Sequence, residues 1–314
     1  MQVGPDLAQP AAQQAPRYRA QGTIVKLAKF GNVQPHVFNP ECRPIVAHRA
    51  ATAYTLVMTA FDIHLVPCFT DNYVPLVRDM ATGTVAIVDP ADAGAVSAAL
   101  DALGWRPSII LNTHHHPDHV GGNLELKAKY GLTVIGPRNE AARIPGIDRP
   151  VGEGDSVAIG GQTGAVLDVP GHTAGHVAYW FEGAEVVFVG DTLFAAGCGR
   201  LFEGTPEQMW HSLNKLADLP GNTLVYCAHE YTESNMRFAL AVDPENAALR
   251  VRDVSVRAAR RHDEPTVPTT IAVELATNPF LRADKPDFAR AMRMSGEDPV
   301  AIFAATRKAK DNFR

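Results

Sequence analysis

The sequence predicts a protein of mixed helices and strands, with an α/β domain over residues 61–230 and a small helical domain after it. From residue 61 onward, short apolar runs of strand length alternate with amphipathic segments of helix length. Beyond residue 230 the patterns are predominantly helical. The 314 residues also exceed the usual size of one domain, which favours a large domain with a smaller one behind it.

The first half of the α/β part alternates strand and helix patterns. One apolar run is closed by Pro90, and the two amphipathic segments end at Gly104 and Gly131. We expect strands at 61–69, 84–90, 108–112 and 133–137, and helices at 93–104 and 121–131.

The second half has the glycine-punctuated, β-branched character of a meander over residues 152–194. A helix then opens at Thr205, a typical cap, with Pro206 next, and it ends at Gly221. We expect strands at 162–170, 176–181, 184–191 and 223–230, the last of these being the final strand, and then helical stretches at 236–242, 247–261 and 298–313.

Composition excludes several classes of protein. The net charge of −5 argues against general attraction to nucleic acid or anionic membranes, and no apolar run approaches the roughly 18 residues of a spanning helix. The four cysteines form no C-x-x-C pair, which fits a reducing compartment. We therefore expect a cytoplasmic protein, with a mitochondrial location as the minor alternative.

Residues 1–60 differ from the rest and are expected to form an extension that is in part poorly ordered. Residues 1–16 are rich in Pro, Ala and Gln and lack a secretory signal pattern. Basic residues dominate 17–50, which leaves a transit peptide as an alternative. A third possibility is that translation starts at Met58, just before the first strand pattern.

The strongest chemical signal is the segment Thr-His-His-His-Pro-Asp-His at residues 113–119, just past an expected strand. In an extended segment alternate side chains share a face, so His114 and His116 can hold one ion. Asp118 and His119 then point toward a second ion. A single histidine at a strand end is usually structural, but four possible ligands within six residues indicate a metal site.

Three further candidates stand at other strand ends, where α/β folds place their sites: His172, Asp191 and His229. Neutral imidazoles and carboxylates suit zinc, iron or manganese, and a set without cysteine is typical of an open catalytic site. Asp89, at another strand end, could fix the tautomer of an imidazole, although an ordinary turn carboxylate is the stronger expectation.

These motifs resemble the metallo-β-lactamase superfamily: T-H-H-H-x-D-H-x-G-G, G-H-T-x-G-H, a strand-end G-D and a strand-end H. Within it, residues 197–205, 229–232, 278–282 and the basic tail at 307–311 are similar to the glyoxalase II (hydroxyacylglutathione hydrolase) family. The resemblance implies an α+β fold, an αββα sandwich with the metals at one edge. It places a catalytic domain at 61–230 and a helical glutathione-binding domain at 231–314.

Carried over by position, the resemblance assigns roles to individual residues. One ion would be held by His114, His116 and His172, and the other by Asp118, His119 and His229, with Asp191 as the bridge. Glutathione would be held by Arg200, Tyr231, Arg307 and Lys310. The chain departs from the pattern at Phe202, where many members have tyrosine, which puts one hydrogen bond to the substrate in question.

The activity that the resemblance implies is hydrolysis of S-D-lactoylglutathione to D-lactate and glutathione, the second step of methylglyoxal detoxification. Two divalent ions, zinc in the first place with iron or manganese as alternatives, would share a hydroxide that Asp118 orients toward the thioester. The expected partner is this small molecule, with no nucleic acid and no membrane, and the expected state is a monomer.

Two alternatives stay open. An iron-dependent sulfur dioxygenase of the same superfamily would act on glutathione persulfide with one metal, against which the full second ligand set argues. A catalytically inactive metal-binding protein is the other, against which the presence of all seven ligands argues. Cys198, between two glycines, is expected to be structural, and His176 either packs at a strand start or supports a ligand.

Overall fold

The computed structural model describes residues 60–313. The expectations for the N-terminal extension, including the transit peptide and a start at Met58, lie outside the described residues. No helix within the described range is long and apolar enough to cross a membrane.

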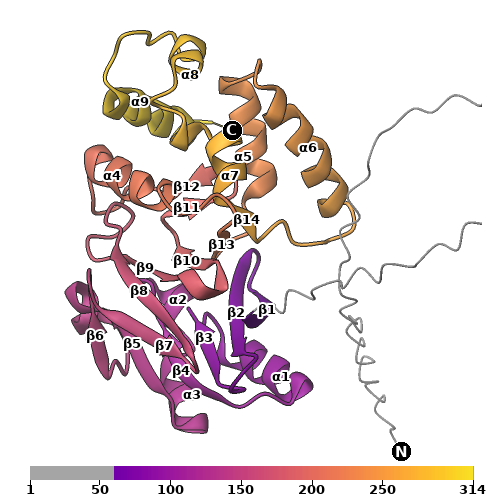
Figure 1. Ribbon diagram of the computed structural model, residues 1–314, viewed down its shortest axis with the longest axis vertical. Helices are drawn as coiled ribbons and strands as arrows, with labels where there is room; N and C mark the ends of the chain where they lie inside the picture. The colour runs from indigo at the N-terminus through magenta and orange to yellow at the C-terminus, as the bar shows by residue number, and fades with distance from the viewer. Residues whose placement is uncertain (1–59, 314) are drawn as a thin grey trace, which may run out of the picture. The chain divides into compact units, whose positions relative to one another are not determined.

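Two six-stranded sheets form the centre of the described chain (Figure 1). In the first, β1 to β3 are antiparallel and β3 to β6 are parallel. Its strands, in spatial order, are β1 (Phe61–Cys68), β2 (Asn72–Asp79), β3 (Val85–Val88), β4 (Pro107–Leu111), β5 (Thr133–Pro137) and β6 (Arg149–Val151).

The second sheet is antiparallel from β7 to β10, and β13 then joins β10 in parallel. Its strands, in spatial order, are β14 (Thr269–Thr270), β13 (Leu224–Cys227), β10 (Val186–Gly190), β9 (Val177–Phe181), β8 (Gln162–Asp168) and β7 (Ser156–Ile159). A two-stranded ribbon of β11 (Leu193–Phe194) and β12 (Gly197–Cys198) follows β10.

Strand β3 is apolar throughout because both of its faces are buried. Val85 and Ile87 join the core beneath α1 (Ala93–Leu103) and α3 (Asn123–Tyr130), whereas Ala86 and Val88 join the core between the sheets. The first sheet is therefore covered by helices on one side and by the second sheet on the other.

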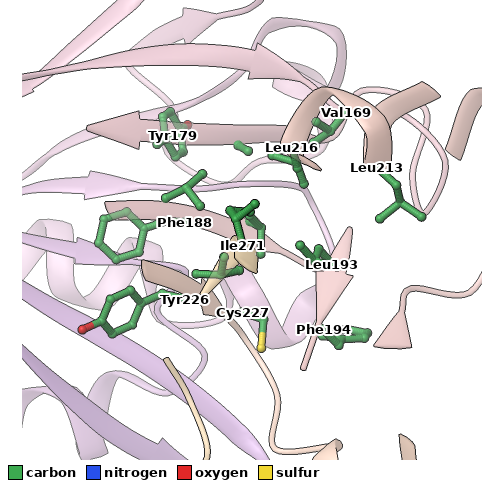
Figure 2. Close-up of a cluster of buried hydrophobic side chains, with 14 of the residues drawn as sticks. Val169, Tyr179, Phe188, Leu193, Phe194, Leu213, Leu216, Tyr226, Cys227 and Ile271 are labelled. Carbon is green, nitrogen blue, oxygen red and sulfur yellow. The ribbon is translucent and has the colours of Figure 1, made fainter. Parts of the chain in front are cut away.

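The second sheet shares its core with one helix that lies between β10 and β13 in the chain and with one that follows β14. Leu213 and Leu216 of α4 (Pro206–Ala217) and Ile271 of α7 (Ile271–Thr277) belong to the same buried cluster as the sheet residues drawn with them in Figure 2. The remaining helices after β13 gather at one end of the sheets (Figure 1): α5 (Thr232–Val242), α6 (Ala247–Arg260), α8 (Pro286–Ala291) and α9 (Pro299–Asp311). The short helix η3 (Pro279–Leu281) lies between α7 and α8 in the chain.

Two expectations of local structure were wrong. The histidine-rich segment does not stay extended, because Pro117 opens the short helix α2 (Pro117–Val120), with His116 at its N-cap. The strand at 223–230 is not the last one, since β14 pairs with β13 after two helices. A strand of two residues carries too little sequence pattern to be found in advance.

Candidate metal centre and substrate pocket

The seven residues expected to be metal ligands converge in the structure. They come from the segments that follow β4, β8, β10 and β13, so the sheet ends bring together residues as far apart as 114 and 229 in sequence. Three of them, His114, His116 and His172, form one group whose ligand atoms lie within 4.8 Å of one another. A second group with the same spacing consists of Asp118, His119 and His229.

In the first group, Nδ1 of His116 lies at the centre. It is 3.0 Å from Nε2 of His114 and 3.1 Å from Nε2 of His172. In the second group, Oδ2 of Asp118 lies 3.6 Å from Nε2 of His119 and 3.5 Å from Nε2 of His229.

Asp191 lies between the two groups. Its Oδ2 is 3.3 Å from Nε2 of His172 in the first group. Its Oδ1 is 3.5 Å from Nε2 of His119 and 3.4 Å from Nε2 of His229 in the second group. Each carboxylate oxygen thus faces a different group, which is the geometry that a bridging ligand requires.

In four of the imidazoles, the nitrogen that faces away from the ligand cluster is Nδ1, and it lies within hydrogen-bond distance of an oxygen atom. Nδ1 of His172 lies 2.9 Å from the carbonyl oxygen of Arg200, which can only accept, so this nitrogen carries the proton. Nδ1 of His229 lies 2.8 Å from Oδ1 of Asp71 and donates to it in the same way. Both imidazoles therefore present an Nε2 lone pair to the centre.

Asp89 fixes the remaining two imidazoles. Its Oδ2 lies 3.1 Å from Nδ1 of His119 and also accepts from the hydroxyl of Thr113 at 2.6 Å. That hydroxyl lies 3.1 Å from Nδ1 of His114 and accepts its proton. The expectation of an ordinary turn carboxylate at Asp89 was therefore incomplete, because this side chain supports both groups.

The residues fit a pair of divalent cations. Nε2 of His119 and Oδ1 of Asp191 are buried and have no hydrogen-bond partner, although a buried polar atom normally has one. Four Nε2 lone pairs, one Nδ1 of His116 and two carboxylates point to the same space. Such a set of donors needs positive charge at its centre, and the two groups can hold a dinuclear metal site.

His114 and His119, one from each group, lie in different electrostatic surroundings. Burial lowers the pKa of His114 well below its usual value, and the neighbouring imidazoles lower it further. Burial also acts to lower the pKa of His119, but Asp191 and Asp89 outweigh it and raise the pKa to about 9. His114 is thus held neutral by its surroundings, whereas the carboxylates around His119 favour positive charge at its place.

A cavity of about 480 Å³ opens onto the metal groups. All four residues expected to bind glutathione line it: Arg200, Tyr231, Arg307 and Lys310. The ring of Tyr231 stacks on His229 at a centroid distance of 4.7 Å. The ring of Phe202 is 61% exposed and packs against His172 and His116 at 5.2 and 5.8 Å.

The two cations of α9 that line the cavity differ in how freely they can contact a substrate. Arg307 is only 5% exposed, and its guanidinium donates to the carbonyl of Cys198 at 2.9 Å and pairs with Asp311 at 2.9 Å. Lys310 is half-buried and donates to the backbone oxygen of Ser234 at 3.0 Å. Burial and the nearby arginines lower its pKa to about 8.

Comparison with known proteins identifies the family. Residues 72–229 match the metallo-beta-lactamase superfamily, and residues 230–313 match the hydroxyacylglutathione hydrolase C-terminus. A hydroxyacylglutathione hydrolase of Rhodospirillum rubrum is 55% identical over 256 residues, covering 82% of this chain and 100% of that protein. This chain belongs to the hydroxyacylglutathione hydrolase family. The enzyme of that name from Methylococcus capsulatus is 53% identical over 81% of this chain and 99% of its own length.

Solved structures agree with this fold. ETHE1 from Myxococcus xanthus aligns with a TM-score of 0.55 and 25% identity, over 79% of this chain and 96% of that chain. TTHA1623, solved in a di-iron-bound form, aligns with a TM-score of 0.52 and 26% identity, over 70% and 100% of the two chains. The expected metallo-β-lactamase fold, α+β with a helical C-terminal part, is confirmed.

One residue that supports a metal ligand had no sequence signal. Asp71 lies in the turn after β1, where an acidic residue is unremarkable, and only the fold brings it to His229. His176 was left open between packing and support. It is fully buried, stacks on His114 at 4.6 Å and accepts from the backbone N–H of Asp191 at 3.1 Å.

The environment of Cys198 agrees with the structural role expected for this residue. It is 5% exposed and lies between Gly197 and Gly199 in the wall of the cavity. Burial raises the pKa of its thiol to about 11, despite the nearby Arg307. A neutral thiol is a poor nucleophile at physiological pH.

Proposed function

We propose that this protein hydrolyses S-D-lactoylglutathione to D-lactate and glutathione, the second step of methylglyoxal detoxification. The observation that carries the proposal is a cavity that opens onto the converging histidines and aspartates, five of which line it, with cationic side chains in its wall. The hydroxyacylglutathione hydrolases of Rhodospirillum rubrum and Methylococcus capsulatus, which match over 100% and 99% of their length, support the same activity.

We propose two divalent cations as the cofactor, zinc in the first place, with iron or manganese as alternatives. His114, His116 and His172 would hold one, and Asp118, His119 and His229 the other, with Asp191 between them. The chemistry that such ions would supply there is hydroxide at neutral pH and polarisation of the thioester carbonyl. The di-iron form of TTHA1623 supports a site of two ions.

The chain's own side chains have three tasks in this proposal. Asp118 orients the attacking water, and its Oδ2 is itself held by a hydrogen bond of 3.1 Å from Nδ2 of Asn72. Arg200 and Lys310 attract the carboxylates of glutathione, whose net charge is negative at neutral pH. Tyr231 keeps the His229 imidazole in place by stacking on it and lines the path of the substrate.

We further propose a monomer in the cytoplasm that acts on a small molecule, without a nucleic-acid or membrane partner. Support comes from the net charge of −5. It also comes from the cysteines of the described residues, Cys68, Cys198 and Cys227, which are all unpaired.

The test is hydrolysis of S-D-lactoylglutathione, followed by loss of the thioester absorbance, with the metal content determined on the same sample. Rapid hydrolysis with about two metals per chain is expected. No hydrolysis at full metal loading would contradict the proposal. Oxygen uptake with glutathione persulfide would then indicate the dioxygenase, and the absence of both activities would indicate an inactive metal-binding protein.

A further inference from the structure

Glu140 is a buried acid that thioester hydrolysis does not itself require. It lies in η1 (Arg138–Arg143) and is 1% exposed. Burying a carboxylate costs several kcal/mol unless hydrogen bonds satisfy its oxygens. Hydrogen-bond donors from two loops satisfy the carboxylate oxygens of Glu140. Its Oε2 accepts from the backbone N–H of His115 at 2.8 Å and from Nδ1 of the same residue at 2.7 Å, and its Oε1 accepts from the N–H of Gly175 at 2.9 Å.

Both loops carry metal ligands. His115 stands between His114 and His116, so fixing its backbone and ring fixes the direction of the two flanking imidazoles. Gly175 belongs to the loop that contributes His172. The carboxylate of Glu140 therefore bridges the two segments that supply all three histidines of the first group.

The packing around this bridge leaves no spare room. A Cβ atom added to Gly175 would lie 2.7 Å from Cγ of Glu140 and 2.9 Å from Cβ of Asn139. Contacts that short do not occur between unstrained carbon atoms, so the close approach requires glycine at this position. The hydrogen bond to Gly175 and the close packing at this glycine are two separate features that join Glu140 to the loop of His172.

The second group is supported by other residues. Asp89 holds Nδ1 of His119, and Asp71 holds Nδ1 of His229. Asp89 also reaches His114 of the first group through Thr113, whereas the hydrogen bonds of Glu140 go to His115 and Gly175 and to no ligand of the second group.

We propose that Glu140 is a positioning residue that holds His114, His116 and His172 together and so affects the affinity of the first metal ion much more than that of the second. This inference rests on the proposed two-ion site. It assigns Glu140 no contact with substrate or metal, because it acts through the backbone and ring of His115 and through Gly175.

The test is the variant Glu140→Gln. The amide keeps the size of the side chain but has one acceptor oxygen, so its NH2 group must face a backbone donor in one of the two loops. Loss of a group that supports metal ligands typically lowers metal affinity by about 10–100-fold. After dialysis against a graded chelator, we expect the metal content to fall from about two ions per chain to about one.

The matched control is Glu274→Gln. Glu274 is equally buried and accepts from the backbone N–H of Ala196 at 2.9 Å, but it lies in α7 and touches no metal ligand. This variant should keep both ions even if it unfolds more easily. Gly175→Ala is a second test, because it displaces Glu140 without changing any charge and should reproduce the selective loss.

Two backgrounds identify the ion that is lost. In a His229→Ala chain, which retains the first group, adding Glu140→Gln should remove the remaining ion. In a His172→Ala chain, which retains the second group, it should change the metal content little. Equal losses in both backgrounds, or wild-type metal affinity in Glu140→Gln and Gly175→Ala, would overturn the inference. A wild-type chain that binds two ions but hydrolyses no thioester would instead overturn the proposed function and leave this inference standing.

Discussion

Phe202 shows how one side chain can tune the pocket without taking part in the chemistry. Its side chain is largely exposed at the cavity, and its ring packs against His116 and His172 of the first group. The exposed edge offers only apolar contact to a substrate that carries carboxylates and amides. Phe202 lacks the hydroxyl with which a tyrosine at this position could form a hydrogen bond to the substrate.

The variant Phe202→Tyr should therefore bind the substrate more tightly. One added hydrogen bond contributes about 0.5–1.5 kcal/mol, so KM for S-D-lactoylglutathione should fall by about two- to tenfold with kcat unchanged. Steady-state kinetics would measure this, with Phe69→Tyr, an exposed position outside the cavity lining, as the control. An unchanged KM would mean that the hydroxyl meets no substrate group.

Lys310 gives the pocket a pH dependence. Because its pKa is lowered to about 8, its ammonium is present at neutral pH and is lost as the pH rises through 8. The attraction for a carboxylate disappears with the charge, so KM should increase above pH 8 while kcat stays level. In Lys310→Arg the charge persists, and the increase in KM should vanish. Equal pH profiles for the two proteins would contradict this role.

Among the helices and strands, those with a strong repeating pattern could be predicted from the sequence. The helix expected at 93–104 is observed as α1, and the strand expected at 133–137 is β5. The conformation of the histidine-rich segment could not be predicted from alternation alone, because Pro117 favours a helical turn. The expected metal ligands could be recognised in the sequence because they cluster at strand ends. Asp71 could not be recognised, because its role depends on a contact with a residue 158 positions away in sequence.

Helix α9 is attached to the catalytic part through Arg307. Its guanidinium donates to the carbonyl oxygen of Cys198 and lies 4.9 Å from the ring of Phe280. Replacing it with methionine leaves that buried carbonyl without its donor, so the free energy of unfolding should fall by about 1–3 kcal/mol. Urea denaturation would measure this.

The control for Arg307→Met is Lys308→Met, an exposed cation on the same helix. It should change stability by less than about 0.5 kcal/mol. If both variants are equally stable, Arg307 is not an anchor, and a substrate contact is then its main role.

At the scale of the whole described chain, the sheets and the C-terminal helices share one core. Phe280 and Phe303 belong to the same buried cluster as Phe188 of β10, and Trp210 of α4 packs on Phe303 at 5.9 Å. A shared core predicts a single unfolding transition, because neither part can lose its partner and keep its apolar surface covered. Far-UV circular dichroism and tryptophan fluorescence should give coincident urea curves, and two separated transitions would contradict the shared core.

The central claim is that the two groups of ligands act together as one binuclear hydrolytic site. The most direct measurement is hydrolysis of S-D-lactoylglutathione by the metal-stripped protein during titration with zinc. Because Asp191 lies between the two groups, activity should develop fully only as the second equivalent is bound. Full activity at one equivalent, or none at two, would contradict the account.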